Sequence, residues 1–182
     1  IALVDTIRCE LESAPKYFMF SSDGRFFYVL YEMKNVIEVY SYKEGERVPI
    51  VEKIQTISST GSKPNQLTAA CAMHFSPDEK HVFCSNAGDN TVSMYDRDDE
   101  TGMLTMRFCL PISGDYPKDL VIFPDNQHIA VANHSSNSIT TFKVDYEKNI
   151  IMMKGKPRKI ETPNCINIWP VPDGNDIEDL EA

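Results

Sequence analysis

Apolar and polar residues alternate along most of this chain in short runs bounded by turn residues. The pattern is clearest where an apolar run at residues 81–86 follows a Ser-Pro-Asp turn, and a second run at residues 91–95 follows the polar turn at residues 87–90. Such alternation, rich in Val, Ile, Phe and Tyr, is typical of half-buried β-strands. With the preceding run at residues 71–75, the stretch predicts three antiparallel strands. No segment carries a sustained helical period.

The same pattern occurs three times along the chain. Each copy begins with an acidic turn residue, at Asp23, Asp78 and Asp125, and the downstream positions then match without a gap. Acidic residues beside Pro, Gly or Asn favour tight turns, because their side chains bond the turn backbone and their neighbours tolerate unusual dihedral angles. The matching columns include Asn35, Asn90 and Asn137; Ile37, Val92 and Ile139; and Tyr40, Tyr95 and Phe142.

Each copy closes with a fourth, weaker run, at residues 51–56, 104–110 and 150–159. Four antiparallel strands in about 50 residues are the pattern of one blade of a β-propeller. We therefore predict an all-β fold with four-stranded antiparallel blades at residues 15–57, 70–110 and 117–160, and the start of another blade at residues 163–169. An ordinary β-sandwich with coincidental similarity is the alternative, and three gapless matches argue against it.

The predicted blades do not close a ring by themselves, and open flanks would expose unpaired strand edges. We expect residues 1–170 to be the C-terminal part of a single propeller domain, in which residues 1–14 finish an outer strand. The missing N-terminal half of the same propeller is then a partner of this chain. Residues 171–182 form an acidic tail, which we predict to be disordered.

Charge and cysteine content narrow the class of protein. The net charge is −9, and the acidic chain has no basic stripe, which argues against nucleic acid as a partner. No apolar run approaches the ~20 residues of a membrane span. The five cysteines are odd in number and lack metal-type spacing. They fit small apolar residues in a reducing compartment, so we predict a cytoplasmic protein.

In a propeller, the first strand of each blade lines the central channel, and the loops between blades form one face with those that follow each second strand. Two sets of columns therefore point to a shared site, and His74 follows on the second inner strand. The first set lies where the inner strands begin: Lys16 and Tyr17, Cys71 and Ala72, and Lys118 and Asp119. The second set lies where the second strands end: Tyr31 and Glu32, Asn86 and Ala87, and Asn133 and His134.

These residues resemble the seven-bladed lactonase propellers of the 6-phosphogluconolactonase type, which also include a carboxymuconate cycloisomerase. The resemblance covers about residues 1–170, so the chain would hold about three and a half blades of that ring. It is carried by ESAPKY at residues 12–17, YE at residues 31–32, SPDE at residues 76–79, SN at residues 85–86, PKDL at residues 117–120 and VAN at residues 131–133. WD-repeat propellers match less well, because Trp169 is the only tryptophan.

The resemblance implies metal-independent hydrolysis of an anionic sugar lactone, without a cofactor. By position, it assigns catalysis to Glu32, Lys16 and His74, and a further catalytic His to the missing half. Glu32 would activate water while a cation steadies the oxyanion. We expect the substrate to be bound by Lys118, Asn86, Asn133, His134 and Tyr17.

The chain departs from the family pattern at five positions of the expected site. Tyr17 replaces a His, Ala72 replaces a Glu, and Ala87 and His74 replace Arg; Lys16 also lacks the planar fork of arginine. Two hypotheses follow. The chain belongs to a sugar-lactone hydrolase, or to a propeller that lost catalysis and binds a small ligand or a protein. Each candidate also has a purely structural reading: Glu32 as a solvated turn acid, Lys16 and Lys118 in salt bridges, and His74 as a hydrogen-bonded strand residue.

Overall fold

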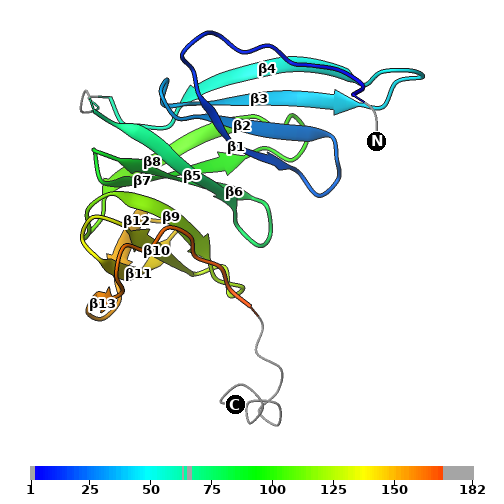
Figure 1. Cartoon of the computed structure of the whole chain (residues 1–182). Helices are drawn as coiled ribbons and strands as arrows, with labels where there is room; N and C mark the ends of the chain where they lie inside the picture. The colour runs from blue at the N-terminus through cyan, green and yellow to red at the C-terminus, as the bar shows by residue number, and fades with distance from the viewer. Residues whose placement is uncertain (1–2, 63, 65–66, 170–182) are drawn as a thin grey trace, which may run out of the picture.

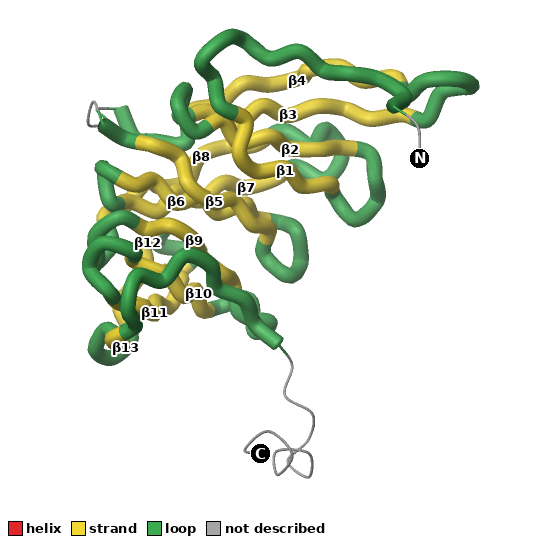
Figure 2. The backbone as a smooth tube through the Cα atoms, viewed as in Figure 1, coloured by secondary structure: helices red, strands yellow, loops and turns green. Residues whose placement is uncertain are grey.

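The structure is a computed structural model, and it describes residues 3–62, 64 and 67–169. Within these residues it contains strands and no helix, arranged in three antiparallel sheets that follow one another along the chain (Figures 1 and 2). The first sheet has the order β1-β2-β3-β4 and consists of β1 (Pro15–Phe20), β2 (Phe26–Tyr31), β3 (Val36–Lys43) and β4 (Ile50–Ser58).

The other two sheets repeat this order. The second consists of β5 (Ala69–Phe75), β6 (His81–Ala87), β7 (Thr91–Arg97) and β8 (Leu104–Pro111). In the third, β9 (Pro117–Ile122), β10 (His128–Asn133) and β11 (Ser138–Asp145) are followed by an outer strand in two pieces, β12 (Ile150–Met153) and β13 (Arg158–Lys159). The first strand of the second sheet, β5, contacts both β1 and β9, so these three are the inner strands. The predicted all-β propeller architecture is confirmed.

Turn residues repeat as the sequence columns predict. The residue after each anchoring acid, Gly24, Glu79 or Asn126, has a positive φ of 69°, 54° and 54°. The repeated asparagines Asn35, Asn90 and Asn137 also have positive φ, and each bonds the segment that leads into the next unit. The three bonds are Asn35 Nδ2 to the Thr68 carbonyl at 2.8 Å, the Tyr116 amide to Asn90 Oδ1 at 2.9 Å, and the Thr162 amide to Asn137 Oδ1 at 2.8 Å.

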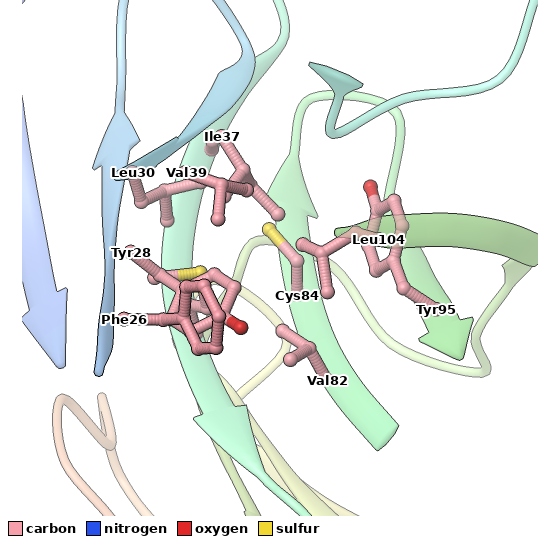
Figure 3. Close-up of a cluster of buried hydrophobic side chains, with 11 residues drawn as sticks. Phe26, Tyr28, Leu30, Ile37, Val39, Val82, Cys84, Tyr95 and Leu104 are labelled. Carbon is pink, nitrogen blue, oxygen red and sulfur yellow. The ribbon is translucent and has the colours of Figure 1, made fainter. Parts of the chain in front are cut away.

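The hydrophobic core lies between successive sheets. Tyr28, Leu30 and Val39 of the first sheet pack against Val82 and Tyr95 of the second (Figure 3). A second cluster, which includes Phe83, Met94, Leu120, Val131 and Phe142, fills the space between the second and third sheets. Alternate residues of each strand thus face a neighbouring sheet, as the apolar pattern requires.

Four expectations need correction or limits. Residues 3–14 form no strand, because no described strand supplies their backbone partners. Residues 163–169 likewise form no strand, and the acidic tail predicted at residues 171–182 lies outside the described residues. The cysteines are free thiols, but Cys9 and Cys165 are exposed rather than buried.

Candidate functional site

Each inner strand has an irregular register at the same column of the repeat. In β1 the pairing skips Lys16, in β5 it skips Cys71, and in β9 it skips Lys118. A bulge of this kind breaks the usual alternation and re-aims side chains. Each skipped residue therefore lines the same hollow as the residue that follows it.

This central hollow has a volume of about 260 Å³. It is lined by two consecutive residues from each of four successive repeats: Lys16 and Tyr17, Cys71 and Ala72, Lys118 and Asp119, and Asn164 and Cys165. The first three pairs are the set predicted from the starts of the inner strands. The fourth pair follows Pro163 as Lys118 and Asp119 follow Pro117. The segment after the third sheet thus contributes one wall without being a strand.

Lys16 and Glu32 form an ion pair, with 2.6 Å between Nζ and Oε1. Their side chains are 25% and 29% exposed. Glu32 is held by its backbone, since its amide bonds the Ala14 carbonyl at 2.9 Å and its carbonyl accepts from the Ala70 amide at 3.3 Å. Burial opposes the charge on Lys16, but the hydrogen bond to Glu32 and nearby negative groups outweigh burial and raise the pKa of Lys16. The bulge thus joins two of the three predicted catalytic residues.

His74 lies between Tyr17 and Asp119, which come from the inner strands on either side. Its Nε2 lies 3.0 Å from the Tyr17 hydroxyl and 3.1 Å from Asp119 Oδ1. The third predicted catalytic residue therefore belongs to a cluster that spans three sheets.

Asp119 is the most heavily hydrogen-bonded group of the hollow. Besides His74, it accepts the backbone amides of Leu120 at 2.9 Å and Ile166 at 3.0 Å. Burial would raise the pKa of its carboxyl, but the hydrogen bonds from His74 and Ile166 outweigh burial and lower it. The hydrogen bond to Asp119 in turn raises the pKa of the Cys165 thiol. Asp119 therefore fixes the wall formed by residues 164–166.

Lys118 is the cation of the hollow without a carboxylate partner among the described residues. Its Nζ lies 5.4 Å from the ring centroid of Tyr116, a cation–π contact that leaves its charge unneutralised. His134 packs against the same ring, with 6.0 Å between centroids, and does not line the hollow. Of these two predicted substrate-binding residues, only Lys118 faces the space.

Asn86 and Asn133 are fully buried. Asn86 donates to the Ser59 carbonyl at 2.8 Å, and Asn133 donates to Thr140 Oγ1 at 3.0 Å. The structure does not bring them to the hollow, and their contact with a substrate stays a prediction. Asp119 stood in the predicted columns but was given no role, and Asn164 and Cys165 were not among the expected site residues. The proline-led column that these two share with Lys16 and Tyr17 is the signal that would have found them.

Comparison of the sequence with known proteins shows the family of this chain. Residues 2–168 match the family model of the lactonase, 7-bladed β-propeller, so the chain belongs to that family. It is 28% identical over 165 residues to a 6-phosphogluconolactonase of Formosa agariphila, covering 90% of this chain and 44% of that protein. It is 20% identical to the 6-phosphogluconolactonase of Bacillus subtilis, covering 85% of this chain and 44% of that protein.

A solved structure agrees with the fold. The periplasmic gluconolactonase of Pseudomonas aeruginosa superposes with a TM-score of 0.82 at 23% identity, covering 91% of this chain and 45% of that one. The chain thus spans less than half the length of these relatives. Within the described residues, no helix is long and apolar enough to cross a membrane, and no group of three or more His, Cys, Asp or Glu could hold a metal ion.

Proposed function

We propose that the full-length protein hydrolyses an anionic sugar lactone, of the 6-phosphogluconolactone class, in the central hollow. The observation that carries the proposal is the set of charges around this space. Lys16 of the hollow forms an ion pair with the carboxylate of Glu32, and Lys118, which has no carboxylate partner among the described residues, lines the same hollow in a chain of the lactonase family. Relatives named 6-phosphogluconolactonase support the choice of substrate.

In the proposed reaction, Glu32 accepts a proton from water as the water oxygen attacks the lactone carbonyl carbon. Lys16 holds the carboxylate in place, and cations steady the charge that develops on the carbonyl oxygen. Lys118 binds the phosphate or carboxylate of the substrate by charge. These side chains provide the base, the charge stabilisation and the substrate contact, so the proposed step uses no metal or cofactor.

We further propose that N-terminal blades complete the ring beside the first sheet. Phe18 and Phe20 of β1 are 56% and 43% exposed, and Leu3 and Ile7 add 86% and 48%. An apolar flank of this kind is what a neighbouring blade would cover. A further catalytic His on those blades, and a cytoplasmic location, stay predictions.

The second candidate is a propeller that binds a sugar acid without turnover. Two positions where the family pattern has charged residues carry buried alanines: Ala72 is 1% exposed, and Ala87 is fully buried. With neither charge present, the hollow has fewer groups to stabilise a transition state, which favours binding over catalysis.

One assay separates the two candidates. Purified full-length protein is given fresh 6-phosphogluconolactone, and loss of the lactone is followed against its spontaneous hydrolysis. Hydrolysis well above that background supports the lactonase. A folded protein that shows only the background rate, yet binds 6-phosphogluconate in a calorimeter, would establish the binding propeller instead.

A further inference from the structure

The arrangement around His74 fixes where its proton must lie. A single nitrogen, Nε2, faces both the Asp119 carboxylate at 3.1 Å and the Tyr17 hydroxyl at 3.0 Å. An ionised carboxylate is only an acceptor of hydrogen bonds. A bare lone pair on Nε2 would be repelled by it, so Nε2 carries the proton and donates to Asp119. This holds for both the neutral and the charged ring.

The same reasoning assigns the proton of Tyr17. Because Nε2 is already protonated, it cannot accept a hydrogen bond from the Tyr17 hydroxyl. The Tyr17 oxygen faces the N–H as a second acceptor, and its own O–H must point elsewhere. Tyr17 has no other side-chain hydrogen-bond partner among the described residues, and it lines the central hollow.

We propose that Tyr17 is a catalytic residue of the hollow: its O–H donates to the lactone carbonyl oxygen, while Asp119 acts through His74 as the positioning residue that turns this proton toward the substrate. The inference rests on the proposed lactonase function and adds a residue to it. Burial and the charge of Asp119 raise the pKa of Tyr17, so the hydroxyl keeps its proton at neutral pH.

The step balances without further reactants. The bond from the water oxygen to the carbonyl carbon forms, the water proton goes to Glu32, and the carbonyl electron pair moves onto the oxygen that Tyr17 holds. The pair then returns as the ring C–O bond breaks, and Glu32 gives its proton to the departing ring oxygen. A neutral donor, Tyr17, and a cation thus both stabilise the negative charge on the carbonyl oxygen.

Tyr17→Phe removes only the donor and keeps the ring that contacts His74 at 5.1 Å between centroids. Loss of one oxyanion donor is expected to lower kcat roughly 10²-fold, with little change in KM. Tyr146→Phe, whose hydroxyl lies 3.4 Å from Asn126 Oδ1 and away from the hollow, is the matched control and should leave kcat unchanged. Tyr17→Phe with kcat within about threefold of wild type would overturn the catalytic role, whatever the lactonase activity.

Asp119→Asn tests the positioning role by a readout that needs no substrate. Nitrogen-15 NMR of the imidazole, assigned with His74→Gln, should show a proton on Nε2 in the wild type and a changed tautomer population in Asp119→Asn. A neutral wild-type His74 with its proton on Nδ1 would refute the arrangement. A wild type without turnover refutes the proposed function and the catalytic role of Tyr17 together, while the NMR result still decides the proton positions.

Discussion

Lys16 and Glu32 meet at 2.6 Å, and this contact decides how the charges of the central hollow are divided. The bulge in β1 aims Lys16 toward the end of β2, where the backbone holds Glu32. The charge of Lys16 is therefore largely neutralised by the carboxylate that it orients. Lys118, which has no such partner among the described residues, remains to attract an anionic substrate.

Glu32→Gln should therefore lower kcat more than a substitution that only weakens substrate binding. An amide cannot take a proton from water, and loss of a positioned general base typically costs about 10²–10⁴-fold in rate. Initial rates of lactone loss in the full-length variant provide the measurement. Glu38→Gln is the matched control, because Glu38 also pairs with a lysine, Lys53 at 2.9 Å, but lies outside the hollow. An active Glu32→Gln variant would remove Glu32 from the mechanism.

Lys118→Ala should raise KM and leave kcat nearly unchanged. A hydrogen bond to a charged group contributes about 1.5–3 kcal/mol, which corresponds to roughly 10–100-fold in KM. The effect should shrink as salt is added, since screening weakens the interaction that is lost. Substrate titrations at two ionic strengths test this, with the exposed Lys80→Ala as control. Equal KM values for both variants would mean that the anion binds elsewhere.

Acid should destabilise the fold partly through Asp119. Its pKa is lowered in the folded state, so its contribution to stability is complete above the pKa of an unfolded aspartate and is lost as pH falls toward the lower, folded value. Asp119→Asn should cost about 1–3 kcal/mol near neutral pH and flatten the acid limb of the stability curve. Urea unfolding across that range measures both effects. Parallel curves for wild type and variant would contradict the prediction.

Two glycines with the same dihedral angle provide a matched test of packing between the first two sheets. Gly102 and Gly155 both have φ of 70°, so alanine at either position costs about 1–2 kcal/mol of backbone strain. At Gly102 the added Cβ would also lie 2.4 Å from a ring carbon of Phe26, whereas nothing lies within 4 Å at Gly155. Gly102→Ala should lower the urea midpoint clearly more than Gly155→Ala. Equal midpoints would show that the Phe26 ring moves aside at no measurable cost in stability.

The repeat made most of the fold predictable, because each turn needs a particular residue type. The columns that begin with Asp23 and contain Asn35 gave the turn positions, and both are turns in all three sheets. The broken outer strand of the third sheet was not predictable from apolar pattern alone. Lys154 bonds back to the Thr141 carbonyl, and Pro157, which has no backbone N–H, follows before β13 resumes the pairing.

The site was predictable in part for the same reason. Columns at the starts of the inner strands placed Lys16, Tyr17 and Lys118 together, and the structure brings them to one hollow. Columns could not show which side chains touch, since contacts across sheets depend on local backbone irregularities. The link from Tyr17 through His74 to Asp119 joins three sheets, and a comparison of repeats alone does not show which side chains meet across them.

The irregular register at one column of every inner strand has a consequence for how such a protein can change. The backbone presents two side chains per repeat to the middle of the ring, and the neighbouring ladder bonds do not depend on which residues these are. Apart from the buried Cys71 and Ala72 and the hydrogen-bonded Asp119, mutations at those positions can then alter ligand preference with little penalty in folding. A library randomised only at Lys16, Tyr17 and Lys118 should therefore yield mostly folded proteins with different ligands.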